Sequence, residues 1–462
     1  MFRIKMMFAN NKKKEINMLE GPIWSQMLLM ALPLAATGIL QQLFNAADVA
    51  VVGSYAGSDA MAAVGSNSPI TALVINLGMG LSLGANVLIA RFIGRGDKKR
   101  VSEMIHTAIP TVIIAGILVI ILAEICTVPL LKLLGVPEDV FSMAETYLRI
   151  YFAGTPILLL YNLEAAIYRS QGDTRTPLIC LAIAGTINVL LNVLMVRVFG
   201  MDADGVAIAT VISNLVSAVM LMIMLMKRAD DLKVTADRIS IKPDLLKEMF
   251  RIGIPAAVQG MVFSLSNICI QSAINSLGSD VMAASAAAFN IEIVVFYFLN
   301  SFSQSGTTFI GQNFGAGNLK RCRRVTRVML AMSMSSTLVL SMIMVLFGKP
   351  ILSLFGANAV LIEIGMIRVF CINSPEILNA AIDGLSGIMR GYGSSLIPAI
   401  ATLLGVCGVR IVWVYAVFYK DPSFFKLMII YPISWVITLA ILAVMYFIVR
   451  NKIEKKDLSH QT

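Results

Sequence analysis

The residues of this sequence that could do chemistry are carboxylates and amides that interrupt long apolar runs. Asp48 lies in such a run, after Gln41, Gln42 and Asn45. Asn45 and Asp48 are one helical turn apart, so their side chains share a helix face. A face rich in oxygen can coordinate sodium or hold a carboxylate that takes up a proton. We therefore predict a cation-coupling site that contains Asp48 and Asn45; the alternative is a carboxylate that caps a helix break near the outer surface.

A second carboxylate, Glu292, is followed closely by the aromatic residues Phe296 and Tyr297. A carboxylate beside aromatic rings suits an organic cation, through charge pairing and cation–π contact. We predict a substrate-binding role for these three residues and place Gln41 with them. The alternative is that Glu292 is the structural partner of a buried arginine or amide.

Two further carboxylates, Glu376 and Asp383, are seven residues apart in another apolar run. Seven residues are two helical turns, so both side chains lie on one helix face. We predict that both belong to the substrate site.

The remaining buried charges are expected to form structural pairs. Glu164 falls opposite Asp383 in an internal repeat, and Arg149 and Arg368 occupy matching positions of that repeat. We predict that these arginines supply partners for such carboxylates, with Glu164 in a structural or gating pair. For Arg410 we predict a structural pair with a carboxylate such as Asp383, in preference to contact with substrate.

The amides Asn188 and Asn192 lie one turn apart in a fifth apolar run. If a cation site forms around Asp48, they would face it and contribute neutral oxygens. The alternative is hydrogen bonding between helices, which buried asparagines commonly provide.

The composition requires that most of the chain lies in lipid. Of 462 residues, 58% are hydrophobic and only 14% are charged, with a mean hydropathy of +0.82. A soluble chain would carry roughly a quarter charged residues. The net charge of +10 comes from short basic clusters between apolar runs, a pattern that favours positive cytoplasmic loops over a nucleic-acid-binding surface, so we expect no nucleic-acid partner. The six cysteines have no metal or redox spacing and are expected to be free thiols.

Charge-poor runs long enough to cross a membrane recur along the whole chain. Connections after even-numbered runs are basic, so the positive-inside rule predicts that both termini are cytoplasmic, with Lys12, Lys13 and Lys14 in a cytoplasmic lead-in. We predict an all-α polytopic membrane protein of about twelve transmembrane helices. Their approximate ranges are 22–52, 58–91, 102–126, 139–170, 176–199, 204–227, 245–276, 280–314, 323–347, 358–390, 394–419 and 424–450.

The second half of the sequence repeats the first. Residues 33–101 match residues 255–325, with Pro33 opposite Pro255 and Gly94 opposite Gly315. Six spans per half give both halves the same orientation, an arrangement known from alternating-access transporters. We predict a six-helix half at 1–226, a cytoplasmic linker at 227–247 and a second six-helix half at 248–462.

Five motifs resemble the MATE family of multidrug and toxic-compound exporters, in its bacterial MepA-like or DinF-like branch. They are LFNAADVAVVGSYAG, SLGANVLIARFIGRGDKK, YRSQGDTRTP, GTTFIGQNFGAGNLKR and GIMRGYGSS, in this order along almost the entire chain. The resemblance implies an antiporter that exports amphipathic, often cationic compounds against inward H⁺ or Na⁺. It also implies a cation site in the first half, formed by the first-span Asp and by an Asp in an Asn-x-x-x-Asp pattern of the fifth span. Here that second position is Asn192, so this sequence departs from the pattern by an amide in place of the carboxylate.

Two other functions remain as alternatives. A flippase or exporter of a lipid-linked or bulky anionic substrate would need cationic residues in its cavity, whereas the candidates here are mostly acidic. A membrane enzyme is the distant alternative, because the chain has only His106 and His460 and lacks a phosphate-binding loop. We therefore expect a non-enzymatic, monomeric protein of the inner cell membrane. Its partners would be small organic substrates and lipids, with no cofactor and no bound metal, and the coupling ion would be H⁺ or Na⁺.

Overall fold

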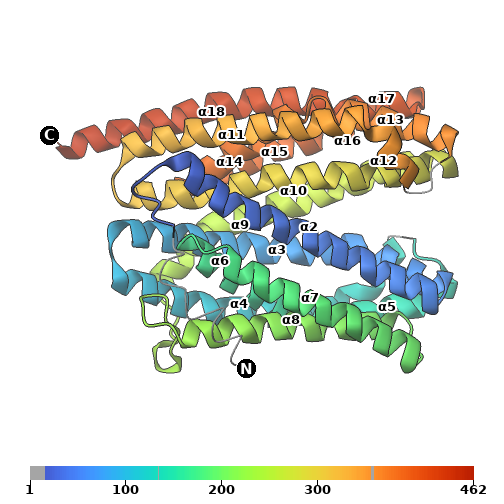
Figure 1. Cartoon of the computed structure of the whole chain (residues 1–462), viewed down its shortest axis with the longest axis horizontal. Coiled ribbons are helices and arrows are strands. Elements are labelled where there is room, and N and C mark those ends of the chain that lie inside the picture. The colour runs from blue at the N-terminus through green and yellow to red at the C-terminus, as the bar shows by residue number, and fades with distance from the viewer. Residues whose placement is uncertain (1–15, 134, 355–357, 462) are drawn as a thin grey trace.

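The computed structural model describes residues 16–133, 135–354 and 358–461, and every regular element in these ranges is helical. Figure 1 shows most helices of the first half (blue to green) below most helices of the second half (yellow to red). The first half contains α2 (Ile23–Tyr55), α3 (Ser58–Arg95), α4 (Lys98–Leu133), α5 (Glu138–Ala153), α6 (Thr155–Ser170), α7 (Arg175–Val193), the π-helical turn η2 (Leu194–Val198) and α8 (Ala203–Met226).

The second half follows a connection that contains the short helix η3 (Ala236–Arg238). Its elements are α9 (Pro243–Asn275), α10 (Ser279–Gly315), α11 (Leu319–Leu346), α12 (Gly348–Leu354), α13 (Ala359–Asn373), α14 (Glu376–Gly391), α15 (Leu396–Thr402), the π-helical turn η4 (Leu403–Gly408), α16 (Val409–Ala416), η5 (Phe418–Lys420), α17 (Phe424–Met428) and α18 (Ile430–Gln461).

In the described ranges, ten helices are long and apolar enough to cross a membrane. The pair α5 and α6, bent by 49° at Gly154, is an eleventh candidate span. The bend follows from Pro156, since proline lacks the N–H that would continue the helix and disfavours helical backbone before it. The predicted fold class, an all-helical membrane protein, is confirmed.

Of the twelve predicted spans, 358–390 is the one that is not among these candidates. It consists of α13 and α14, of 15 and 16 residues, separated at Ser374 and Pro375. Each piece is shorter than the roughly 20 residues that cross a bilayer. Pro375 corresponds to Pro156 in the repeat, so the same proline interrupts both halves at the same place.

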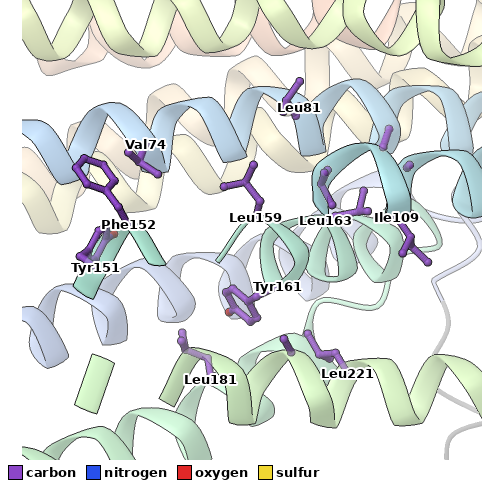
Figure 2. Close-up of a cluster of buried hydrophobic side chains, with 14 of the residues drawn as sticks. Val74, Leu81, Ile109, Tyr151, Phe152, Leu159, Tyr161, Leu163, Leu181 and Leu221 are labelled. Atoms are coloured by element: carbon purple, nitrogen blue, oxygen red, sulfur yellow. The ribbon is translucent and has the colours of Figure 1, made fainter. Parts of the chain in front are cut away.

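Two large hydrophobic cores organise the helices, and the first helix of each half begins in the core of the other. The start of α9, with Leu245, Met249 and Ile252, belongs to the core of the first half, part of which Figure 2 shows. The start of α2, from Ile23 to Leu34, belongs to the core of the second half.

Glycines permit the closest contacts between the halves. Any Cβ on Gly94 of α3 would collide with the carbonyl oxygen of Gln312, and any Cβ on Gly315 of α10 would collide with that of Arg91. Gly94 and Gly315 are repeat equivalents, so this crossing of α3 and α10 is reciprocal. It lies at the end of the bundle that carries the basic loops, which we call the basic end.

Candidate functional site

The carboxylate of Asp48 is buried between three helices of the first half. Its side chain comes from α2, and only 8% of the residue is exposed. Asn192 of α7 donates from Nδ2 to Oδ1 of Asp48 at 2.5 Å, and the Thr210 hydroxyl of α8 donates to Oδ2 at 3.5 Å. No lysine or arginine pairs with Asp48 within the described ranges, so the negative charge is met only by neutral groups.

Asn188 completes a ring of polar side chains, which we call the Asp48 cluster: Asp48, Asn188, Asn192 and Thr210. Asn188 accepts a hydrogen bond from Asn192 at 3.3 Å and donates to Thr210 at 3.5 Å. Oδ1 of Asn192 is buried and has no hydrogen-bond partner among the described residues. One carboxylate with amide and hydroxyl oxygens is a donor set that a proton or a monovalent hard cation can use.

Close packing of α2 against α7 positions this cluster. Any Cβ on Gly185 of α7 would collide with the ring of Phe44 on α2. Phe44 is one turn before Asp48, and Gly185 is one turn before Asn188, so this contact brings the two polar faces together.

The structure therefore gathers Asp48, Asn188 and Asn192, but it does not add Asn45. Asn45 is exposed and forms no hydrogen bond with the cluster in the described part of the chain. Thr210 was missed, because one threonine in an apolar span carries no distinctive sequence signal.

In the second half, Glu292 is paired with an arginine. Nε and Nη2 of Arg368 donate to Oε2 of Glu292 at 3.0 and 2.8 Å, and Nη1 donates to Ser285 at 2.7 Å. The guanidinium also lies 5.4 Å from the ring centroid of Phe289, a residue that is 40% exposed. Glu292 is thus the structural partner of a buried arginine, which was the alternative to substrate binding. Its side chain is still 17% exposed.

The aromatic residues predicted beside Glu292 have different neighbours. Tyr297 lies against α2, where any Cβ on Gly38 would collide with its ring. Phe296 and Tyr297 are half-buried, with ring centroids 6.0 Å apart. Gln41 is also half-buried and makes no hydrogen bond with described residues.

Glu376 and Arg410 are buried without an ion pair in the described ranges. Oε1 of Glu376 accepts from Asn379 at 2.8 Å, and Oε2 has no partner. Arg410 donates from Nε to Ser434 at 3.2 Å and stacks on Tyr431, 4.0 Å from the ring centroid. The predicted pair of Arg410 with Asp383 is not formed, because the guanidinium is held by an aromatic ring and a hydroxyl instead.

Asp383 instead ends a chain of side chains that crosses between the halves, which we call the Arg169–Asp383 chain. Nη1 of Arg169 on α6 donates to Gln304 at 3.1 Å, Gln304 donates to Asn300 at 2.7 Å, and Asn300 donates to Oδ2 of Asp383 at 3.0 Å. Gln304 and Asn300 were missed, although they lie one turn apart in α10, the same signal that selected Asn188 and Asn192.

Arg149 and Glu164 do not pair with each other. Arg149 pairs with Glu124 and, at 2.9 Å, with Glu145, one turn earlier on its own helix α5. Glu164 lies beyond the bend on α6, fully buried, and neither of its oxygens has a hydrogen-bond partner among the described residues. The predicted ion pair for Glu164 is therefore wrong, because Arg149 pairs with Glu124 and Glu145 instead.

Comparison with known proteins gives a consistent result. The sequence model of the MatE family matches residues 33–194 and again residues 255–416, which also confirms the predicted repeat. A relative, the probable multidrug resistance protein YoeA of Bacillus subtilis, is 28% identical over 438 residues, 93% of this chain and 95% of its own length.

Other relatives carry different names. The FAD transporter of Shewanella oneidensis is 28% identical over 356 residues, 76% of this chain and 78% of its own length. The multidrug export protein MepA of Staphylococcus aureus is 21% identical over 386 residues, 83% of this chain and 85% of its own length. An outward-facing structure of a multidrug resistance MATE transporter superimposes with a TM-score of 0.88 at 21% identity, covering 96% of this chain and 99% of that chain.

Proposed function

The chain belongs to the MatE family, and from this premise we propose that it is a secondary antiporter that exports small amphipathic, cationic organic compounds in exchange for H⁺ or Na⁺. It is a multi-pass membrane transporter and not an enzyme. The basic loops favour cytoplasmic termini in the cell membrane.

The observation that carries this proposal is the Asp48 cluster. A buried carboxylate without a cationic partner is costly inside a membrane unless it binds a cation or a proton. Binding there would draw together α2, α7 and α8, which supply the four side chains. A cation that binds one conformation better than the other shifts the equilibrium between them. The cluster is thus suited to couple ion entry to a change in the first half.

The substrate would bind between the halves and, in an exporter, leave on the side away from the basic end. Contacts between the halves at the basic end are close, whereas Phe289 and Asn290, nearer the other end of α10, are exposed. In this state substrate would exchange on the side opposite the basic loops. The Arg169–Asp383 chain crosses between the halves, so the hydrogen bonding of Asp383 would depend on whether the basic end is closed.

A second candidate substrate is a bulky anionic metabolite such as a flavin nucleotide. The charge of Glu292 is already balanced by Arg368, so this part of the protein does not present a free acid. Arg368 also lies over the exposed ring of Phe289, a surface suited to a flat aromatic group. The Shewanella oneidensis relative is named an FAD transporter.

The test uses protein reconstituted in vesicles with either an imposed H⁺ gradient or an imposed Na⁺ gradient. Transport of ethidium and of FAD is measured for wild type, Asp48→Asn and the control Asp59→Asn, an exposed carboxylate at the start of α3. We expect gradient-driven ethidium transport that Asp48→Asn abolishes and Asp59→Asn preserves, and the effective gradient identifies the ion. Transport of FAD alone selects the second candidate. Undiminished transport by Asp48→Asn refutes the coupling role of the cluster.

A further inference from the structure

A pocket of about 660 Å³ lies at the basic end of the first half, far from the Asp48 cluster. It is formed by the start of α4 and by the segment between α8 and α9. Such a volume is within the range of small-ligand sites. We call it the linker pocket.

The segment that forms one wall is held firmly against α4. The backbone N–H of Thr235 donates to Nε2 of His106 at 3.0 Å, and Nδ1 of His106 lies 2.7 Å from the Ser102 carbonyl oxygen. The Thr107 hydroxyl donates to the Ser240 carbonyl at 3.1 Å and accepts from the Lys242 N–H at 3.2 Å. The pocket is therefore built from ordered backbone.

Most acidic residues around the linker pocket are already compensated. Asp230 accepts from Nε of Arg228 at 2.8 Å, Asp231 pairs with Lys98 at 3.6 Å, and Glu103 pairs with Arg100 at 3.6 Å. Burial by itself would raise the pKa of Asp230, but hydrogen bonds from Arg228 outweigh it and hold that pKa below its usual value. Of the described acidic residues that line the pocket, only Asp237 lacks an ion pair.

The cations outnumber this remaining carboxylate. Lys99, Lys233, Arg238 and Lys242 line the pocket, are exposed, and form no ion pair within the described ranges. The Thr235 hydroxyl lines the same pocket and is buried without a hydrogen-bond partner among described residues. Convergent cations with a free hydroxyl donor are the groups that bind phosphate oxygens.

We propose that the linker pocket is a binding site for a phosphate-bearing anion, held by Lys233, Arg238 and Lys242 from the linker and by Lys99 from α4. Because the ligand would bridge α4 and the segment that joins the halves, it would clamp that segment onto the first half. Phosphate could come from an anionic lipid headgroup, since basic clusters at a membrane surface attract such lipids, or from a soluble polyphosphate.

The experiment measures binding to the full-length protein in nanodiscs, with two probes. Inorganic pyrophosphate is titrated in phosphatidylcholine nanodiscs, and separately the thermal midpoint is compared between phosphatidylcholine and phosphatidylglycerol nanodiscs. The test variant is Lys233→Gln with Arg238→Gln. The matched control is Lys320→Gln with Arg324→Gln, which removes the same charge from exposed positions at the start of α11, outside the pocket.

Loss of charged hydrogen bonds to phosphate should weaken pyrophosphate binding at least about tenfold in the test variant and leave the control unchanged. This result is expected if the ligand is a soluble polyphosphate. If the ligand is an anionic lipid headgroup, phosphatidylglycerol should raise the thermal midpoint of wild type and of the control, but not of the test variant. If wild type responds to neither probe, or if both variants lose the response equally, the linker pocket is not a phosphate site.

Discussion

Asp48 is the only carboxylate of its cluster, because Asn192 stands where the family resemblance implies a second aspartate. Its closest partner is the amide of Asn192, at 2.5 Å. An amide can present either its N–H or its oxygen, so the cluster can stabilise the empty carboxylate and also coordinate a cation.

Asn192→Asp should therefore change which ion drives transport. Two carboxylates at hydrogen-bond distance cannot both be charged, so the pair would hold a proton. We expect the ratio of H⁺-driven to Na⁺-driven export to rise, as measured in vesicles with separate gradients. An unchanged ratio would place the coupling ion outside this cluster.

Glu292 and Arg368 give the second prediction at the residue scale. Glu292→Gln leaves a buried guanidinium without its counter-charge, and breaking a buried pair costs about 3–5 kcal/mol. We expect a lowered thermal midpoint, and we expect Glu292→Gln combined with Arg368→Gln to recover part of it. If Glu292→Gln is as stable as wild type, the pair has no structural role, and Glu292 is free to bind substrate.

Among the helices, the contact of α2 with α7 decides whether the Asp48 cluster can form. Gly185 is required there because any side chain would collide with the ring of Phe44. Two prolines also set the course of the helices. Pro156 lies at the bend between α5 and α6, and Pro375 lies at the matching break between α13 and α14.

Gly185→Leu should separate the two helices and abolish gradient-driven transport. Overpacking of this kind costs about 1–3 kcal/mol, so the protein should still fold. Adding Phe44→Ala, which vacates the space, should restore transport, and Gly65→Ala, at a position with open space, serves as the control. Full activity of Gly185→Leu would show that the α2–α7 contact does not support coupling.

At the scale of the whole molecule, the state described is one in which the halves meet at the basic end. The reciprocal contacts of Gly94 and Gly315 require that the backbones of α3 and α10 touch there. The Arg169–Asp383 chain crosses the same interface, and the Gln312 side chain donates to the Ser170 carbonyl at 2.7 Å.

Gly315→Ala should shift the protein toward a state with this end open. The added Cβ would collide with the Arg91 carbonyl only while the ends touch, so the open-to-closed ratio should rise at least about fivefold. With spin labels attached at Lys99→Cys and Lys320→Cys in a Cys126→Ser background, electron paramagnetic resonance should measure a longer distance between the two labels. Identical distance distributions with and without Gly315→Ala would contradict this.

The sequence by itself determined the helical membrane fold, the internal repeat and the positions of the buried polar residues. These features are local: hydropathy follows from each segment of about 20 residues, and a carboxylate in such a segment is unusual wherever the segment lies. Asp48 and Glu292 could be selected on that basis alone, as could the face shared by Asn188 and Asn192.

Only the tertiary structure decided which groups meet. Glu292 joins Arg368, Arg410 stacks on Tyr431, Asp383 accepts from Asn300, and Thr210 enters the Asp48 cluster. Each pairing depends on how far two helices are rotated and how closely they cross. Both are set by packing between residues distant in the chain, such as Gly185 against Phe44, so spacing within one helix could not reveal them.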